Sequence, residues 1–301
     1  MDQLAVQPIE RIIDMSPNPN IWTRRSVLKM AGFGTLAGFL PKTQQIPIAL
    51  QLYSIRDDCR KDFDGSLEQV AKMGLAGVEF AGYYHYSENA ADLKKKLDAL
   101  NLKVAGTHIR LDTLQGDALK STIEFHQIIG CSFLIVPSSA DFTDPEKSKA
   151  LAETFNRIAE ILKPLGMACG YHNHTAEFKK EAGKTYWDLF AERTSKDVIL
   201  QQDCGWSAAA GVDPVEYIKK YPGRTKTVHF KPTVVGGDKT KEAILGQDSV
   251  DWAAVYSACS TVGATEWIVL EQETYPDGKT PLECTQESLA GLKRILAGIQ
   301  L

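Results

Sequence analysis

Long apolar runs, clustered cysteines and excess positive charge are all missing from this sequence. No apolar segment reaches the roughly 18 residues that a membrane-spanning helix needs. The six cysteines are widely spaced and form no C-x-x-C pair, which argues against a zinc ribbon and a compact disulfide framework. The formal net charge of −4 offers no basic surface to a phosphate backbone, so a nucleic-acid partner is disfavoured.

Nucleotide-binding signatures are missing as well. No G-x-G-x-x-G segment follows a predicted strand, and no G-x-x-x-x-G-K-[ST] segment occurs, so a dinucleotide-binding fold and a P-loop both lose their main signal. What remains is an ordinary globular composition, with 44% hydrophobic and 24% charged residues.

The first 45 residues resemble an export signal. Arg24 and Arg25 precede a short Gly/Ala-rich apolar stretch at residues 30–40, as in a bacterial twin-arginine signal. We therefore expect residues 1–45 to engage the twin-arginine export machinery and to place the protein in the periplasm. No clear cleavage site precedes Pro41, so an uncleaved signal that anchors the protein to the membrane is an alternative. The other alternative is an amphipathic first helix of the domain.

Residues 46–301 alternate between short apolar runs and longer helical segments, as a parallel α/β fold requires. Amphipathic segments at 67–73, 90–100, 147–162 and 289–297 separate several of these runs. Eight such units in about 250 residues predict a single (β/α)8 TIM barrel. The predicted strands span 48–53, 77–80, 103–107, 133–137, 167–172, 198–203, 225–230 and 267–271.

Polar and ionisable residues end six of these eight runs. In a (β/α)8 barrel the carboxyl ends of the strands share one mouth, where the chemistry takes place. Burying carboxylates and imidazoles there is costly unless something binds them. The residues are Glu79, His108, His172, His174, Glu177, Asp203, His229, Lys231, Glu271 and Glu273.

A divalent metal is the simplest partner for this mouth. His172, Asp203, His229 and Glu271 are separated by 31, 26 and 42 residues, about one β/α unit each, so adjacent strands would present one ligand apiece. Imidazole and carboxylate ligands without a thiolate suit Mn²⁺, Mg²⁺, Co²⁺ or Zn²⁺. The alternative for each residue alone is a hydrogen-bonded structural group.

From residue 48 to residue 299 the chain resembles the sugar phosphate isomerase/epimerase family, the xylose isomerase-like TIM barrels. No single segment is specific, but their order and spacing are specific for the family, though not for one substrate. The segments are QLYSIR at 51–56, GVEFAG at 77–82, TH at 107–108, GYHNH at 170–174 with EF at 177–178, QDCGW at 202–206, VHFK at 228–231, VDW at 250–252 and VLEQE at 269–273.

The resemblance implies a metal held at the ends of strands five to eight. Asp203, His229 and Glu271 match three of the family's ligand positions, whereas the fifth strand carries His-Asn-His where a Glu is usual. His172 falls on that ligand position, and His174 competes with it, because alternate residues share a face. The missing Glu often serves as a base, a role that Glu177 or His174 could take. Pro232, where relatives usually have Asp, and the less glycine-rich loop at 246–249 are further departures.

The chemistry implied is proton abstraction next to a sugar carbonyl, with an enediolate stabilised by the metal. Glu271 could double as a base opposite Glu177 or His174. Five further residues are candidates for contacts with the sugar. Lys231 and His108 would contact sugar oxygens, Glu79 would bind a hydroxyl or pair with a cation, and Trp206 with Tyr53 would wall the ring.

We therefore predict a metal-dependent isomerase or epimerase of a neutral sugar or keto-sugar, since phosphorylated sugars are scarce in the periplasm. A metal-dependent lyase or hydrolase of 3-keto-glycosides is the first alternative, distinguished by release of the aglycone. A sugar-binding barrel without catalysis is the second. An endonuclease for abasic DNA is disfavoured by the acidic charge. A homo-oligomer remains open.

Overall fold

The fold is a closed barrel of eight parallel strands, and the computed structural model describes residues 45–299. Around the barrel the strands follow the order β1-β10-β9-β8-β5-β4-β3-β2. They are β1 (Ile48–Gln51), β2 (Gly77–Phe80), β3 (Lys103–His108), β4 (Phe133–Val136), β5 (Ala168–His172), β8 (Ile199–Asp203), β9 (Thr227–Phe230) and β10 (Trp267–Leu270). The prediction of a single (β/α)8 barrel is confirmed.

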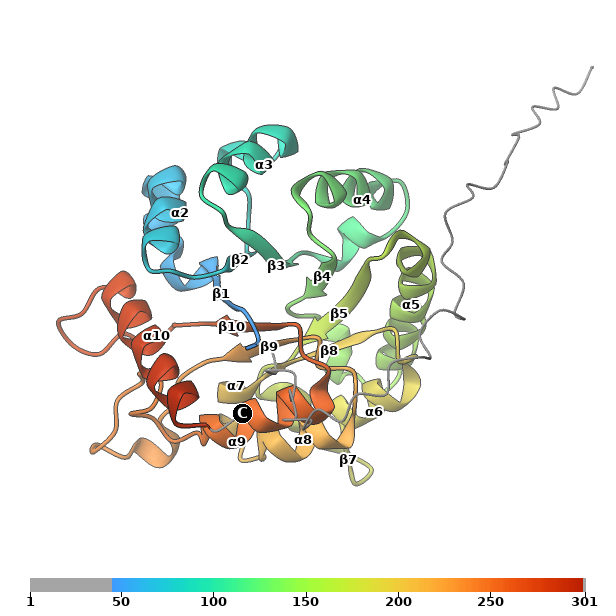
Figure 1. The fold of residues 1–301 in the computed structure, drawn as a ribbon. Helices are drawn as coiled ribbons and strands as arrows, with labels where there is room; N and C mark the ends of the chain where they lie inside the picture. Colours follow the sequence, from blue (N-terminus) through green and yellow to red (C-terminus); the bar gives the residue numbers. More distant parts are fainter. Residues whose placement is uncertain (1–44, 300–301) are drawn as a thin grey trace, which may run out of the picture. The chain divides into compact units, whose positions relative to one another are not determined.

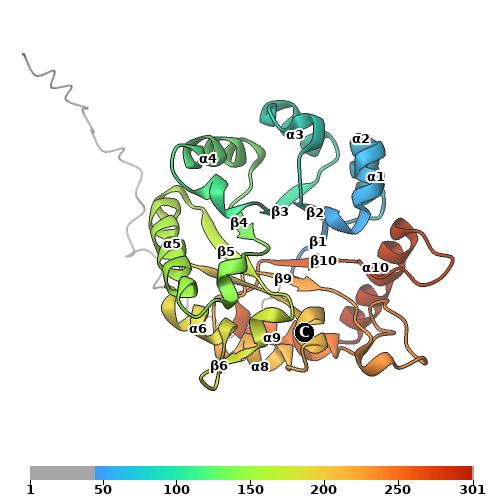
Figure 2. The same ribbon diagram turned by 180° about the vertical axis from the view of Figure 1, so that it is seen from behind.

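Helices surround the strands on the outside, as Figures 1 and 2 show from opposite sides. They are α1 (Arg56–Lys61), α2 (Phe63–Lys72), α3 (Ala90–Ala99), α4 (Ala118–Ile129), α5 (Lys147–Leu162), α6 (Tyr186–Arg193), α7 (Cys204–Ala209), α8 (Pro214–Lys220), α9 (Trp252–Ala258) and α10 (Pro281–Gly298). A two-stranded hairpin, β6 (Lys180–Glu181) with β7 (Lys184–Thr185), lies between β5 and α6 in the chain.

The main hydrophobic core lies between the strands and this outer ring of helices. Alternate strand residues face opposite sides of a sheet, and the outward ones, such as Leu50, Val78 and Phe230, are fully buried in that core. A smaller apolar cluster of Ala49, Ala105 and Val269 lies apart from it, with Trp267 packed against it. Apolar packing therefore covers the outward face of the strands and only a small part of the barrel interior.

Most predicted segment boundaries agree with the structure to within a few residues. The chain leaves β1 at Gln51 and turns into a 3-10 helix (Leu52–Ile55), so the first predicted strand was too long. The last helix begins at Pro281, eight residues before the predicted start. Its start is fixed by a capping box, in which the Thr280 hydroxyl accepts from the Glu283 N–H and the Glu283 carboxylate accepts from the Thr280 N–H.

The predicted export signal at residues 1–45 lies outside the described residues, except for its last position. Within residues 45–299, no helix is both long and apolar enough to span a bilayer. All six cysteines are buried free thiols.

Candidate metal centre

Four of the predicted metal ligands meet inside the barrel at the carboxyl ends of neighbouring strands. His172, Asp203, His229 and Glu271 each offer one ligand atom, and these atoms all lie within 4.8 Å of one another. All four side chains are buried. The strand register explains this proximity, because Asp203 pairs with His229 and Glu271 directly follows β10, the strand next to β9.

Asp203 is held so that one carboxylate oxygen has no partner. As the N-cap of α7, its Oδ1 accepts a hydrogen bond from the Trp206 N–H at 2.7 Å. Asn173 fixes the backbone of Asp203 with two hydrogen bonds. Its Oδ1 accepts from the Asp203 N–H at 2.9 Å, and its Nδ2 donates to the Asp203 carbonyl at 3.2 Å. Oδ2 is buried and has no hydrogen-bond partner among the described residues.

A buried carboxylate with an orphan oxygen is stabilised by a bound cation or by a proton. Burial raises the pKa of Asp203 to about 7, because the attraction of Lys231 only partly offsets desolvation and the charge of Glu271 adds to it. The orphan oxygen, the imidazoles and the second carboxylate together form a donor set that can bind a divalent metal. The residues present therefore fit such an ion.

His229 lies between two carboxylates. Its Nδ1 is 2.7 Å from Glu271 Oε2, and its Nε2 is 2.5 Å from Glu79 Oε2. Burial alone would lower the pKa of His229, but Glu79 and Glu271 raise it to about 10. The same attraction holds the pKa of Glu271 below its usual value despite burial. Without a metal, the ring is thus an imidazolium that bridges both acids.

His172, rather than His174, belongs to the four-residue set. Its Nε2 lies 3.8 Å from Asp203 Oδ2, and its Nδ1 lies 3.0 Å from Gln201 Oε1. Burial holds the pKa of His172 well below its usual value, and repulsion from His229 and His108 adds to this, so the ring is neutral. The His174 ring is 5.1 Å from that of His172, and burial lowers its pKa to about 4.

Glu177, which the sequence predicted as a candidate base, accepts hydrogen bonds from residues that precede it closely in the chain. Its Oε2 accepts from the His174 N–H at 2.8 Å, and its Oε1 accepts from the Tyr171 hydroxyl at 3.4 Å. Burial raises the pKa of Glu177. Glu177 therefore holds the turn that carries His174, and its role as a base stays a prediction.

Glu79 and His108 lie among the histidines, whereas the sequence placed them against the substrate. Glu79 is fully buried, and its carboxylate accepts from Gln51 Nε2 at 2.8 Å and Gln201 Nε2 at 2.7 Å in addition to His229. His108 Nε2 is 2.7 Å from Gln201 Oε1 and 3.2 Å from Glu79 Oε2. Glu79 thus pairs with the His229 ring, which is one of the two roles expected for it, while its contact with a sugar hydroxyl stays a prediction.

Glycine makes room for this buried carboxylate. A Cβ on Gly106 would lie 2.9 Å from Glu79 Oε1. The register between β2 and β3 also shifts after Val78, next to Glu79.

Lys231, Trp206 and Glu273 form a second group at the mouth. The Lys231 ammonium lies 4.1 Å from the centre of the Trp206 ring and forms an ion pair with Glu273. The Trp206 ring is 5.7 Å from that of His174, which links this group to the end of β5. Glu273 received no role from the sequence, although its position two residues after Glu271 is a signal for the same face of an extended chain.

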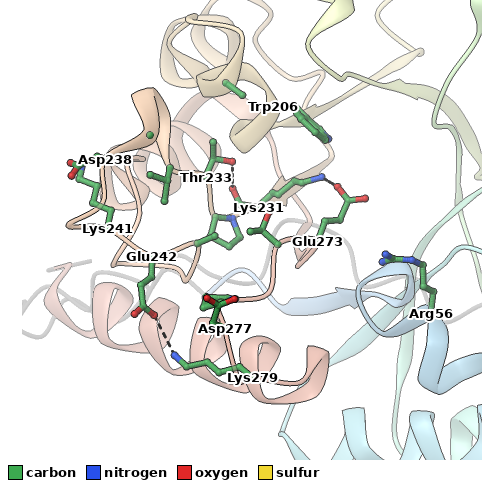
Figure 3. A pocket seen from close by; sticks show the side chains of 17 residues that line it. Arg56, Trp206, Lys231, Thr233, Asp238, Lys241, Glu242, Glu273, Asp277 and Lys279 are labelled. Atoms are coloured by element: carbon green, nitrogen blue, oxygen red, sulfur yellow. Dashed lines mark hydrogen bonds and ion pairs between the residues drawn. The ribbon is translucent and has the colours of Figure 1, made fainter.

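A cavity of about 940 Å³ opens beside this group, between the loops after β9 and β10 (Figure 3). Figure 3 shows Lys231 pointing toward Glu273, with Trp206 on one side and Arg56 on the other. Tyr53, predicted as a wall for the sugar ring, is 42% exposed and is not among the residues that line this cavity. Its ring packs under the Arg56 guanidinium at 4.5 Å instead.

Comparison with known proteins gives one family and several relatives. Residues 67–295 match the family described as xylose isomerase-like TIM barrel. An inosose dehydratase from Clostridium botulinum is 23% identical over 260 residues, which cover 73% of this chain and 85% of the relative.

Solved structures show the same fold. A sugar phosphate isomerase/epimerase from Parabacteroides distasonis superposes with a TM-score of 0.71 at 24% identity and covers 84% of this chain and 97% of its own. An L-ribulose 3-epimerase superposes with a TM-score of 0.60 at 16% identity, with 84% and 95% covered.

Proposed function

The chain belongs to the xylose isomerase-like TIM barrel family, and from this premise we propose that it is a divalent-metal-dependent enzyme that removes a proton next to the carbonyl group of a sugar. The observation that carries the proposal is the orphan Asp203 Oδ2, buried within a set of two imidazoles and two carboxylates. Relatives named as an inosose dehydratase and as isomerases or epimerases support an activity of this kind.

His172, Asp203, His229 and Glu271 would hold the metal. Bound there, a divalent ion supplies Lewis-acid stabilisation of the negative charge that develops on a carbonyl oxygen. With two nitrogen and two carboxylate ligands and no thiolate, Mn²⁺, Mg²⁺, Co²⁺ and Zn²⁺ are the candidates.

The residues at the mouth would orient the substrate and move the proton. His174 is neutral at pH 7 because burial lowers its pKa, so its ring can accept a proton on the β5 side. Glu271 is the candidate base on the β10 side. The Lys231 ammonium, held by Trp206 and Glu273, would donate hydrogen bonds to a sugar oxygen.

Isomerisation or epimerisation is the outcome we propose first. The base takes the proton on the carbon next to the carbonyl, and the electron pair of that C–H bond forms the enediolate. The proton then returns to the neighbouring carbon, or to the opposite face of the same one. Because Glu271 follows β10 and His174 follows β5, the two would exchange protons on two sides of the substrate.

Elimination is the second candidate, and two observations favour it. One is the relative named inosose dehydratase. The other is the cavity of about 940 Å³ beside Lys231, which has room for a group attached to the sugar. In a 3-keto-glycoside, the enolate electrons would break the C–O bond on the next carbon, and the departing oxygen would take up a proton. The enzyme would then be a lyase or hydrolase that releases the aglycone.

Proton NMR in D₂O with ketoses and 3-keto-glycosides, with and without chelator, tests the proposal. Chelator-sensitive uptake of deuterium next to the carbonyl is the expected result, and the product separates isomer from free aglycone. No exchange by protein that demonstrably carries a metal would contradict enolisation. Glu271→Ala that loses metal yet keeps its sugar affinity would favour the non-catalytic sugar-binding barrel.

We also propose export through the twin-arginine pathway, which would place the enzyme among unphosphorylated sugars. The support is the pair Arg24–Arg25 before the apolar stretch at 30–40. Replacing both arginines with lysine should keep the protein in the cytoplasmic fraction. Unchanged fractionation of that variant would contradict the proposal, and wild-type protein in the membrane fraction would indicate an uncleaved signal.

A further inference from the structure

Two possible metal-binding sets overlap inside the barrel. One is the set of His172, Asp203, His229 and Glu271, and the other is His108 with the same two histidines. We propose that Gln201, which has no place among the ligands, decides between them by fixing His172 as the Nδ1–H tautomer, so that its Nε2 lone pair faces Asp203. The inference rests on the proposed function only in that a metal binds here.

Among the partners of the Gln201 side chain, Glu79 can only accept hydrogen bonds. Glu79 Oε2 accepts from Gln51 Nε2 at 2.8 Å and lies 2.5 Å from His229 Nε2, the contacts of an ionised carboxylate, which has no hydrogen to donate. One end of the Gln201 amide lies 2.7 Å from Glu79 Oε1. That end must therefore be the NH₂ group. The same nitrogen is 3.3 Å from the Thr227 hydroxyl.

The other end of the amide is then the oxygen, and it faces two imidazoles. Gln201 Oε1 lies 3.0 Å from His172 Nδ1 and 2.7 Å from His108 Nε2. A carbonyl oxygen only accepts, so both ring nitrogens must carry a hydrogen. A neutral imidazole carries one N–H, which leaves His172 Nε2 bare and 3.8 Å from Asp203 Oδ2.

Glu79 orients His229 in the same way. The Nε2–H of His229 donates to Glu79 at 2.5 Å, so Nδ1, on the Glu271 side, is the nitrogen available to a metal. Carboxylates and carbonyls that bind the far nitrogen of a ligand histidine set its tautomer and raise metal affinity. The nitrogens that face Gln201 and Glu79 carry hydrogens, so the metal is assigned to the set with Asp203 and Glu271.

The adjacent residue provides a matched control. Gln202 lies on the same strand with its side chain on the opposite face, is also buried, and donates to the Ser207 hydroxyl at 2.8 Å. Gln201→Leu and Gln202→Leu each remove one buried amide from β8. Only the first removes the contact with His172.

The first test uses metal-free wild-type protein with ¹⁵N-labelled histidine, read by two-bond ¹H–¹⁵N correlation. Of the six histidines in the chain, His172 is assigned by comparison with His172→Gln. A protonated Nδ1 and a bare Nε2 on His172 are expected. A protonated Nε2 would overturn the proposal, and a protein that binds no metal at all would still give this answer while ending the proposed function.

The second test titrates Mn²⁺ and Zn²⁺ into the two leucine variants by calorimetry. Gln201→Leu should weaken binding about 10–100-fold. Gln202→Leu should weaken it by less than about twofold, because its partner Ser207 donates to the Asp203 backbone carbonyl and not to a ligand atom. Equal affinities in the two variants would overturn the proposal.

If Gln201→Leu does not fold, Glu79→Gln is the substitute variant. It replaces the carboxylate that accepts from the Gln201 NH₂ group with an amide that can also donate. It should weaken metal binding by a similar factor and convert part of the His172 signal to the Nε2–H form. An unchanged His172 signal in Glu79→Gln would count against the proposal.

Discussion

The two faces of the barrel strands carry opposite chemistry. On the outward face, residues such as Leu50, Phe230 and Leu270 are buried among the helices. On the inward face of neighbouring positions lie Gln51, His229 and other polar groups, which are just as buried. Barrel interiors of this fold are usually filled with branched apolar side chains. The outward face therefore stabilises the fold, whereas the inward face gives up apolar packing for a site.

The inward polar groups are arranged so that almost all are satisfied before any ligand arrives. Glu79 accepts from Gln51, Gln201 and His229. Asp203 Oδ2 is the exception within the four-residue set. A network of this kind is rigid where its members are paired, and it is incomplete at the point where a cation would bind.

The largest expected effect comes from removing an inward ligand. Glu271→Ala should abolish tight metal binding and lower chelator-sensitive deuterium exchange by about 10³-fold or more, since Lewis-acid stabilisation supplies several kcal/mol. Calorimetry and NMR measure the two losses. Glu266→Ala, which removes a surface ion pair with Lys226, is the control and should leave both unchanged. Deuterium exchange that survives in Glu271→Ala would contradict the claim that the inward face carries the metal-dependent chemistry.

A substitution on the outward face should lower the stability of the fold and leave metal binding unchanged. Phe230 is fully buried and packs on Trp252 of α9, with ring centres 4.7 Å apart. Phe230→Ala should cost about 3–5 kcal/mol of unfolding free energy, measured by urea denaturation. Metal affinity of the folded fraction should stay near that of the wild type. A specific loss of metal affinity without loss of stability would show that the two faces are not separable.

Asp203→Asn should stabilise the metal-free protein by about 1–3 kcal/mol, because it removes a buried unpaired carboxylate. The pKa of Asp203 in the folded protein, about 7, exceeds the ordinary aspartate pKa of 3.8. The native state therefore binds more protons, and wild-type stability falls as pH rises from about 4 to 7. The gain in Tm from Asp203→Asn should therefore be small at pH 4 and full above pH 7. A variant less stable than the wild type at pH 8 would contradict this account.

The smallest effect is a pH dependence of metal affinity. Since the pKa of His229 is raised to about 10 in the metal-free protein, a metal must displace one proton from this ring. The apparent affinity should rise about tenfold per pH unit between pH 7 and 9. Below pH 7 the slope should steepen, because Asp203 then also binds a proton. Calorimetric titrations at several pH values would measure it, and a flat profile would exclude proton release by His229.

The sequence predicts the barrel and the ligand set better than it predicts their surroundings. Apolar runs mark the strands directly, and polar residues about one β/α unit apart at the strand ends pointed to His172, Asp203, His229 and Glu271, with His174 as a competitor of His172. The structure brings these four together, while their roles as ligands remain a prediction.

The sequence alone did not predict how deeply a side chain is buried or which distant residues it contacts. Glu79 and His229 are 150 positions apart in sequence and meet only because the barrel closes. Gln201 looks like a neutral strand residue until its contacts with β2, β3 and β5 are known. Glu273 and the capping box at Thr280, in contrast, had signals in the sequence. These are the alternation after Glu271 and the T-x-x-E pattern at residues 280–283.

The most direct test of the account is anomalous diffraction from crystals of the protein soaked in Mn²⁺. The account predicts one strong inward peak bounded by His172 Nε2, Asp203 Oδ2, His229 Nδ1 and the Glu271 carboxylate. A peak among His108, His172 and His229 would contradict the role given to Gln201. The absence of any peak inside the barrel, from crystals that hold Mn²⁺ elsewhere, would contradict the metal centre itself.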